Sequence, residues 1–382
     1  MRNAAEKRLQ GGISFFCAAV FAIFAFTFIA FYKSAELEVA YDYIATGKLQ
    51  YDGFLLAGVV VPLLVGLALW LNRFAGFKRE WTAMAYLPSA FILAAATDVG
   101  RSLFTGNFSS SWLWVFGVVM LVYIFFAVVL NRMLFEKIKD PSMAANRIIW
   151  RNLILFVLVF LFVGTLSGGD KNFKREALQY KYFKCGDVDG ALAVGGQSPI
   201  ASQQLSAQRA FLLSVKGELA EHFFDYPLYF GAESLLPSVE RDAPIAPDTI
   251  YSHIGAVRAA DEDAMEYLSR VAMGDASTPA ACDYYLVALL AELRLVDFAD
   301  KLFEFYNVGD ADRLPKQYKE ALMLYAHIVP EFDVKINDSA MQERFSALIA
   351  ELRKNKNISS LHSHLLRANY GDTYWCYFLC GE

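Results

Sequence analysis

Long apolar stretches recur through the first 167 residues of the chain. About 20 apolar residues cross the hydrocarbon layer of a bilayer as a helix, and five stretches reach or approach that length. Pro62 and Pro88 lie inside the second and third, where a proline kinks a helix but is tolerated within a membrane. The fifth reaches spanning length only across Arg151, whose long side chain would extend to the interface. We therefore expect transmembrane helices over residues 12–32, 54–71, 81–97, 112–130 and 148–167.

From residue 168 onwards the apolar residues recur every three or four positions, which is the helical period, and strand-like alternation is scarce. Thr278 is expected to cap one of the resulting helices, with Pro279 at its first helical position. A proline-rich connection at residues 225–247 is expected to divide the helices into two blocks. The spacing predicts five helical hairpins, which begin near residues 174, 203, 248, 279 and 315.

The hairpins start at intervals that scatter around the 34 residues of a tetratricopeptide repeat. In the first hairpin Tyr182 and Ala191 occupy the tyrosine and alanine positions of that repeat, whereas Arg175 replaces its tryptophan. The expected fold class is all-α, with an N-terminal transmembrane helical bundle over residues 1–167 and a degenerate tetratricopeptide-like α-solenoid over residues 168–382.

The composition agrees with a membrane protein. Hydrophobic residues make up 56% of the chain and charged residues 20%, whereas a soluble domain has about 45–50% and about a quarter. The net charge of −5 lacks the basic footprint of nucleic-acid binding, so we expect no nucleic-acid partner.

Positive charges beside the predicted spans indicate the orientation. Eleven lysines and arginines lie in the N-terminal segment and the second and fourth loops, against three in the alternating loops, which places the N-terminus in the cytoplasm. With five spans in an inner (plasma) membrane, the C-terminal domain is then periplasmic. Four spans would place it in the cytoplasm, as Lys171, Lys174 and Arg175 after the fifth stretch would favour.

Three segments of the C-terminal half are distinctive: QRAFLLSVKGELAEHFFDYP at residues 208–227, YSHIG at 251–255 and PKQYKEAL at 315–322. They resemble a family of membrane proteins from Bacteroidota-type bacteria, known only as a domain of unknown function. The resemblance implies an integral membrane protein with tetratricopeptide-like helices, and it supplies no activity.

Residues with catalytic or metal-binding chemistry are sparse. His222 and Asp225 would suit a general base and its partner, but a histidine among aromatic residues more often serves packing. His362 and His364 are two residues apart and would face different sides of a helix, unlike helical zinc ligands at positions i and i+4. We expect no metal and no cofactor.

Asp98 and Arg101 form a charged pair at the end of the third predicted span. An acid inside a membrane is a functional candidate because burying it is costly. Both residues lie where the helix leaves the bilayer, so a structural ion pair is the favoured interpretation.

Four cysteines fall in the C-terminal half. On a helix, the α-carbons of Cys376 and Cys380 would lie about 6 Å apart, near the upper limit for a disulfide. Buried thiols are the favoured interpretation. In a periplasmic domain, a bond from one of these residues to Cys185 or Cys282 is the alternative.

The leading hypothesis for function is a membrane-anchored helical-repeat scaffold of the cell envelope that binds a protein or peptide. Tyr251, Tyr285 and Tyr318 are candidate binding aromatics, although aromatic residues at helical spacing also form cores. The bilayer and a protein are the expected partners.

Two alternatives belong to other functional classes. The first is a membrane-interface enzyme that combines Asp98 and Arg101 with His222 or His253. It is the less favoured hypothesis, because the sequence contains no recognisable catalytic motif. The second is an accessory subunit of a transporter or channel, whose conductance would depend on Asp98.

Overall fold

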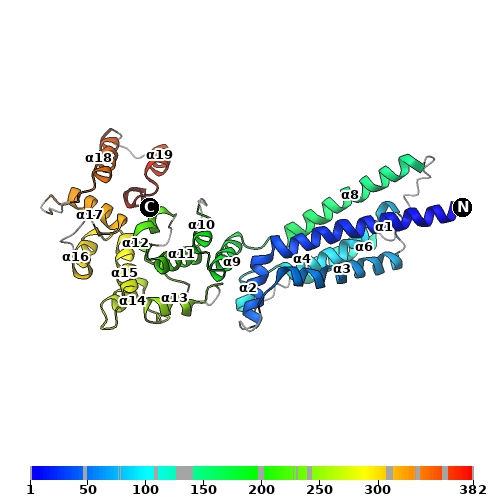
Figure 1. Ribbon diagram of the computed structural model, residues 1–382, viewed down its shortest axis with the longest axis horizontal. Coiled ribbons are helices and arrows are strands. Elements are labelled where there is room, and N and C mark those ends of the chain that lie inside the picture. Colours follow the sequence, from blue (N-terminus) through cyan, green and yellow to red (C-terminus); the bar gives the residue numbers. More distant parts are fainter. Residues whose placement is uncertain are drawn as a thin grey trace. The chain divides into compact units, whose positions relative to one another are not determined.

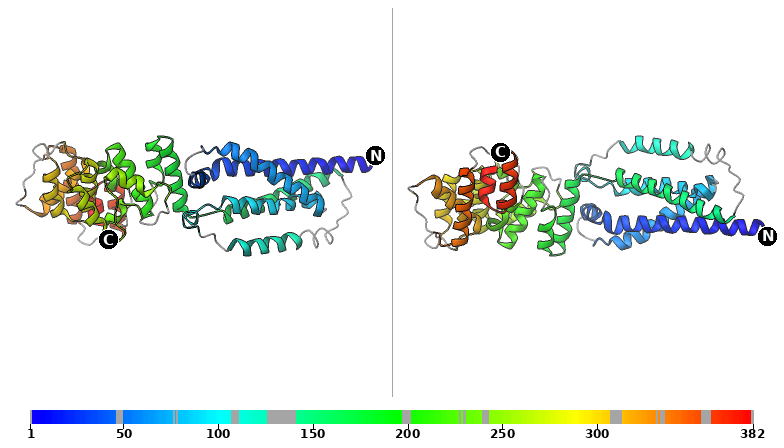
Figure 2. Two further views of the ribbon diagram at one scale, coloured as in Figure 1. Left: turned by 90° about the horizontal axis from the view of Figure 1, so that it is seen from below. Right: turned by 90° about the horizontal axis from the view of Figure 1, so that it is seen from above.

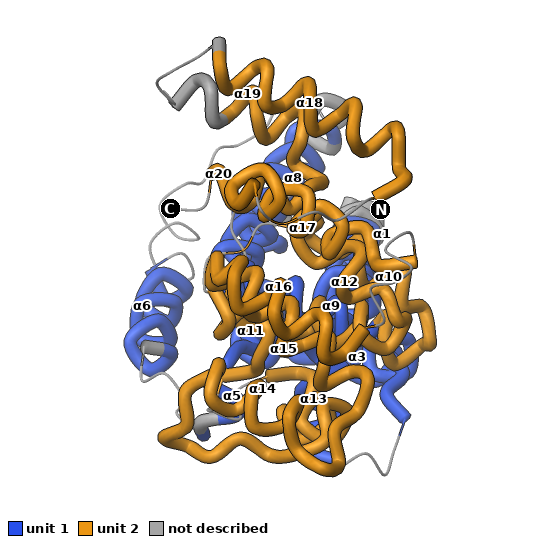
Figure 3. The backbone as a smooth tube through the Cα atoms, turned by 90° about the vertical axis from the view of Figure 1, so that its left-hand side faces the viewer, with its two compact units in different colours: residues 1–181 blue, residues 182–382 orange. Residues whose placement is uncertain are grey.

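The protein forms two compact units in its computed structural model, residues 1–181 and residues 182–382 (Figure 3). Every regular element in the described part of the chain is a helix, which confirms the all-α class. The structure describes residues 2–45, 50–75, 77, 79–106, 111–125, 141–196, 202–226, 228, 231–238, 243–306, 313–330, 332, 336–354 and 360–380.

Long apolar helices run side by side in the first unit (Figures 1 and 2). Aromatic rings pack between them: Phe24 stacks on Phe160 with 3.8 Å between ring centroids, and Phe21 lies 5.0 Å from Tyr86. The elements of this unit are α1 (Arg2–Thr27), the π-helix η1 (Phe28–Tyr32), α2 (Ser34–Ala45), α3 (Gly53–Ala75), the 3₁₀-helix η2 (Arg79–Tyr86), α4 (Leu87–Thr97), α5 (Ser102–Thr105), α6 (Ser111–Phe125), α8 (Pro141–Leu166) and α9 (Lys171–Lys184).

Among the residues that the structure describes, three helical stretches are long and apolar enough to cross a membrane: Gly11–Tyr32, Gly53–Ala75 and Asn146–Leu166. They correspond to the first, second and fifth predicted spans. The fifth includes Arg151, as expected, and its guanidinium pairs with Glu80 at the start of η2.

The third predicted span differs from a continuous α-helix. Its first part is η2, and α4 begins only at Leu87. Pro88 explains this boundary, because a proline needs no amide donor in the first turn of a helix but breaks the ladder of an interior turn. The fourth predicted span corresponds to α6, and its last residues, 126–130, lie outside the described part of the chain.

The 3₁₀-helix η2 lies at the centre of the first unit, in contact with α1, α3 and α8. Its Ala83 amide donates to Oδ1 of Asn152 on α8 at 2.8 Å, and Nδ2 of the same Asn152 donates to the carbonyl of Ile148 at 2.9 Å. A buried asparagine on α8 therefore supplies a side-chain acceptor to the backbone of η2.

The boundary between the units falls after the predicted one. Phe173 and Ala177 of α9 pack in one buried cluster with Ala35 and Val39 of α2. Most of α9 therefore belongs to the first unit, although the apolar helices end at residue 166.

Helices of the second unit follow in the predicted order (Figure 1), and α11 packs against α12 and α15 against α16, as two of the five predicted hairpins require. Thr278 caps α15 by accepting the amide of Ala281 at 3.1 Å, as predicted. The elements are α10 (Val188–Ala193), α11 (Gln203–Lys216), α12 (Leu219–His222), η4 (Phe223–Asp225), η5 (Gly231–Leu235), α13 (Pro247–Ile254), α14 (Ala264–Ala272), α15 (Pro279–Ala291), α16 (Leu295–Phe305), α17 (Lys316–Ile328), α18 (Ser339–Lys354), α19 (Ser360–Tyr370) and α20 (Tyr374–Cys380).

The described part of the proline-rich connection packs against helices on both sides of it in the sequence. It contains η5, which packs against both α11 and α15, and Leu235 and Leu236 are fully buried there. The connection therefore joins the helices before and after it instead of dividing them into two blocks.

Candidate functional site

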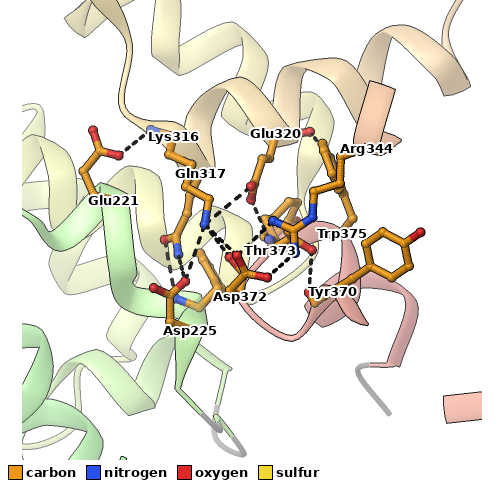
Figure 4. A network of polar contacts seen from close by, with 12 residues as sticks. Glu221, Asp225, Lys316, Gln317, Glu320, Arg344, Tyr370, Asp372, Thr373 and Trp375 are labelled. Carbon is orange, nitrogen blue, oxygen red and sulfur yellow. Dashed lines mark hydrogen bonds and ion pairs between the residues drawn. The ribbon is translucent and has the colours of Figure 1, made fainter. Parts of the chain in front are cut away.

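A polar cluster joins α17 to the segment that leads into α20 (Figure 4). We call it the α17–α20 network. It consists of Asp225, Lys316, Gln317, Glu320, Arg344 and Asp372.

Glu320 holds the start of α20 through both its side chain and its backbone. One carboxylate oxygen accepts the amide of Tyr374 at 2.7 Å, and the Glu320 carbonyl accepts Nε1 of Trp375 at the same distance. The side chains of Tyr374 and Trp375 are fully buried. The aromatic C-terminal segment is thus part of the core of the second unit.

Lys316 lies among three carboxylates, four residues before Glu320. Its Nζ donates to the carbonyl of Asp372 at 2.6 Å and lies 3.5 Å from the carboxylate of that residue. Nζ also lies 3.9 Å from Glu320 and 4.0 Å from Asp225. One cation therefore connects α17, η4 and the turn before α20.

Burial and ion pairing shift the pKa values of these carboxyl groups in opposite directions. Burial raises the pKa of Glu320 to about 7 and also raises the pKa of Asp225. Hydrogen bonds from Arg344 lower the pKa of Asp372 to about 2. At neutral pH the network thus combines a permanently charged acid with one near its titration midpoint.

His222 and Asp225 are brought together, as the sequence suggested, with 2.8 Å between Nδ1 and Oδ2. Asp225 also accepts from Nε2 of Gln317 at 3.3 Å. No cluster of three or more potential metal ligands occurs among the described residues. His364 is exposed, and the side chain of His362 lies outside the described part.

A second contact places a possible nucleophile beside a possible general base. Ser214 Oγ on α11 lies 2.8 Å from Nε2 of His253 on α13, and the ring of Phe211 meets the imidazole edge-on at 5.4 Å. Partial burial lowers the pKa of His253, which favours the neutral imidazole that a general base needs. His253 was a candidate from the sequence, whereas Ser214 was not, because the contact joins residues 39 positions apart.

The three candidate binding tyrosines are all buried. The hydroxyl of Tyr318 donates to Asp283 at 3.0 Å, and that of Tyr251 to the carbonyl of Pro237 at 3.5 Å. Tyr285 packs edge-on against Phe305. They pack in the core of the second unit, so we do not assign them a binding role.

At the end of the third predicted span, Asp98 accepts Nε1 of Trp112 at 3.1 Å. Arg101 pairs with Glu176 at 2.6 Å and with Asp170 at 3.5 Å. The Arg101 contacts attach the start of α9 to the segment that follows α4.

Comparison with known proteins found one family model, described as a family of unknown function (DUF6057), which matches residues 8–274 and 266–381. No curated protein and no solved structure matches the chain.

Proposed function

The chain belongs to the DUF6057 family, whose function is unknown, and we propose that it is a membrane-anchored protein whose helical second unit binds a protein partner. The proposal includes five spans, a cytoplasmic N-terminus and a periplasmic second unit in the inner membrane of a Bacteroidota-type bacterium. It also includes a tetratricopeptide-like stacking of the helix pairs.

The lengths of the elements support a fourth and a fifth span. Residues 81–86 of η2 rise about 2.0 Å each and the eleven of α4 about 1.5 Å each, so together they extend about 28 Å, close to the thickness of about 30 Å of hydrocarbon. The described part of α6 is apolar throughout and adds 15 residues.

An apolar surface on α16 and α17 carries the proposal of protein binding. Val296 and Phe303 are seven residues apart, on one face of α16, and are 57% and 46% exposed. Phe303 lies 6.0 Å from Phe332, which lies 4.8 Å from Tyr325 on α17. Ile328, one turn after Tyr325, is 54% exposed. Clustered exposed apolar side chains are typical of protein-binding surfaces.

Site-specific photocrosslinking in cells tests this proposal. A photoreactive residue at Val296 is expected to give a discrete protein adduct, and one at exposed Ser252 on α13 is the matched control. Phe303→Glu should abolish the adduct while the melting temperature stays unchanged. Equal adducts from positions 296 and 252, or an adduct that survives Phe303→Glu, would contradict it.

Topology is tested separately with paired reporter fusions after Glu382, one active only in the periplasm and one only in the cytoplasm. A periplasmic signal is expected. A cytoplasmic signal would indicate four spans instead of five and would direct the search for a partner to the cytoplasm.

The distance between Ser214 and His253 favours a second candidate function, acyl transfer with Ser214 as the nucleophile. A fluorophosphonate probe should then label the protein in its membrane but not the Ser214→Ala variant. Equal labelling of both proteins, or labelling of neither, would leave the scaffold as the better proposal.

A further inference from the structure

The sulfur atoms of Cys376 and Cys380 lie 3.9 Å apart on one face of α20. The other cysteines have different surroundings. Cys17 is buried in the first unit, Cys185 is exposed, and Cys282 lies 3.3 Å from the hydroxyl of Ser277. All five are free thiols.

The backbone of α20 is compatible with a bond between the two sulfurs. Residues four apart on a helix have α-carbons about 6 Å apart, inside the range of roughly 4.4–6.8 Å found in disulfides. Cys380 lies in the last turn of α20, whose carbonyls have no donors from a following turn. A small opening of this turn would bring the sulfurs from 3.9 Å to bonding distance.

The contacts that fix α20 come from its earlier residues. Tyr374 and Trp375 are held by Glu320, and the hydroxyl of Tyr377 donates to the carbonyl of Ala291 at 2.8 Å. Rearranging the turn at Cys380 therefore leaves these anchors in place.

The two thiols differ in solvent exposure. Cys376 is buried, whereas Cys380 is partly exposed. An oxidant therefore meets Cys380 first. Burial, together with Cys380, raises the pKa of the Cys376 thiol to about 12, so its thiolate is scarce at neutral pH.

We infer that Cys376 and Cys380 are a thiol–disulfide modification site, which a disulfide-bearing oxidant such as glutathione disulfide or a disulfide oxidoreductase converts to an intrahelical disulfide. The Cys380 thiolate attacks the oxidant, forming a mixed disulfide and releasing one thiol. The Cys376 thiolate then attacks the Cys380 sulfur and releases the second. Two protein thiols are oxidised by two electrons, and one oxidant disulfide is reduced to two thiols.

Glutathione disulfide is the probe for a direct test on the full chain in detergent. After incubation, the protein is denatured, alkylated and digested with trypsin, which releases residues 368–382 as one peptide. We expect this peptide to lose two hydrogens and to carry no alkyl group. A glutathione adduct on Cys380 beside an alkylated Cys376, or two alkylated cysteines, would overturn the inference.

Exposed Cys185 is the internal control, because no second sulfur contacts it in the described part of the chain. It should stop at the glutathione adduct. The Cys376→Ser variant should likewise retain the adduct on Cys380, and Cys380→Ser should leave Cys376 alkylated. Rapid loss of the adduct from Cys376→Ser would show that another group resolves it and would overturn the pairing.

The rate of the second step gives a readout that does not depend on the serine variants. With the thiol pKa about 12, the Cys376 thiolate fraction rises about tenfold per pH unit near neutrality. Conversion of the mixed disulfide should therefore accelerate about tenfold from pH 7 to pH 8. A pH-independent rate would exclude Cys376 as the resolving thiol.

Discussion

The backbone amide of Tyr374 donates to the buried carboxylate of Glu320 across 54 residues of sequence, at 2.7 Å. This contact fixes the first residue of α20 to the middle of α17. The carboxylate is nearly inaccessible to solvent, with 2% of the side chain exposed. The stability of the C-terminal segment is therefore linked to the protonation of one acid.

We expect Glu320→Gln to stabilise the protein at pH 8 and to have little effect at pH 5. A carboxyl whose pKa rises from 4.5 to about 7 on folding binds its proton more tightly in the folded state. Its contribution to the free energy of unfolding is therefore largest at low pH and is lost as pH rises from 4.5 to 7. Glutamine keeps an acceptor for Tyr374 without the charge, so the expected gain at pH 8 is roughly 1–3 kcal/mol.

Urea unfolding in detergent, followed by tryptophan fluorescence at both pH values, measures this effect. Glu304→Gln is the matched control, because Glu304 is an exposed partner of Lys301. The prediction is wrong if Glu320→Gln changes the free energy of unfolding equally at pH 5 and pH 8.

Replacing Asp372 by asparagine should lower the free energy of unfolding, whereas Glu320→Gln should raise it. Arg344 donates to Asp372 at 2.9 Å, and the lowered pKa means that this stabilisation is present above pH 4 and is lost as pH falls toward 2. Half of the side chain is exposed, so we expect a loss of only about 0.5–1 kcal/mol at pH 7. A double-mutant cycle with Arg344→Ala isolates the pair, and additive losses would contradict the coupling.

Replacing Leu293 with glycine should stabilise the protein. Its φ of 58° places a side chain in the left-handed region, at the turn between α15 and α16. Such a conformation costs a non-glycine residue roughly 1–2 kcal/mol. Leu293→Gly should raise the melting temperature, whereas Leu293→Ala retains the strained Cβ and should not. A higher melting temperature for the alanine variant would attribute the effect to the exposed leucine side chain instead.

Asn152→Ala should destabilise the first unit by about 1–3 kcal/mol, because the buried amide of Ala83 would lose its acceptor. Hydrogen exchange of the η2 amides in detergent measures the local effect. Thr165→Ala on the same helix is the control, since the Thr165 hydroxyl donates to the carbonyl of Phe162 in its own helix and the residue is exposed. Equal protection of η2 in both variants would refute the role of Asn152.

Local signals made the starts of single helices predictable. Thr278 followed by Pro279 marks the start of a helix whatever its tertiary neighbours are, and the structure begins α15 there. Pro88 also carried a local signal for the start of α4. The residues before it gave none for a 3₁₀-helix, and the contact of η2 with Asn152 joins residues 69 positions apart.

The polar network was beyond sequence reasoning for a similar reason. Lys316 and Glu320 have helical spacing, but Tyr374 contributes a backbone amide, which has no residue signature. Asp98 and Arg101 are close in sequence, which suggests a local pair, but sequence spacing gives no sign that Arg101 also donates to Glu176, 75 residues away. Such partners are set by the three-dimensional packing, which a single sequence does not reveal.

The position of α9 determines where the chain should be cut for biochemical work. A fragment that begins where the apolar helices end would carry Phe173 and Ala177 without the α2 side chains that cover them, and Glu176 without Arg101. Newly exposed apolar side chains would make such a fragment prone to aggregate. Cutting at residue 182 instead keeps each of these residues with its neighbours.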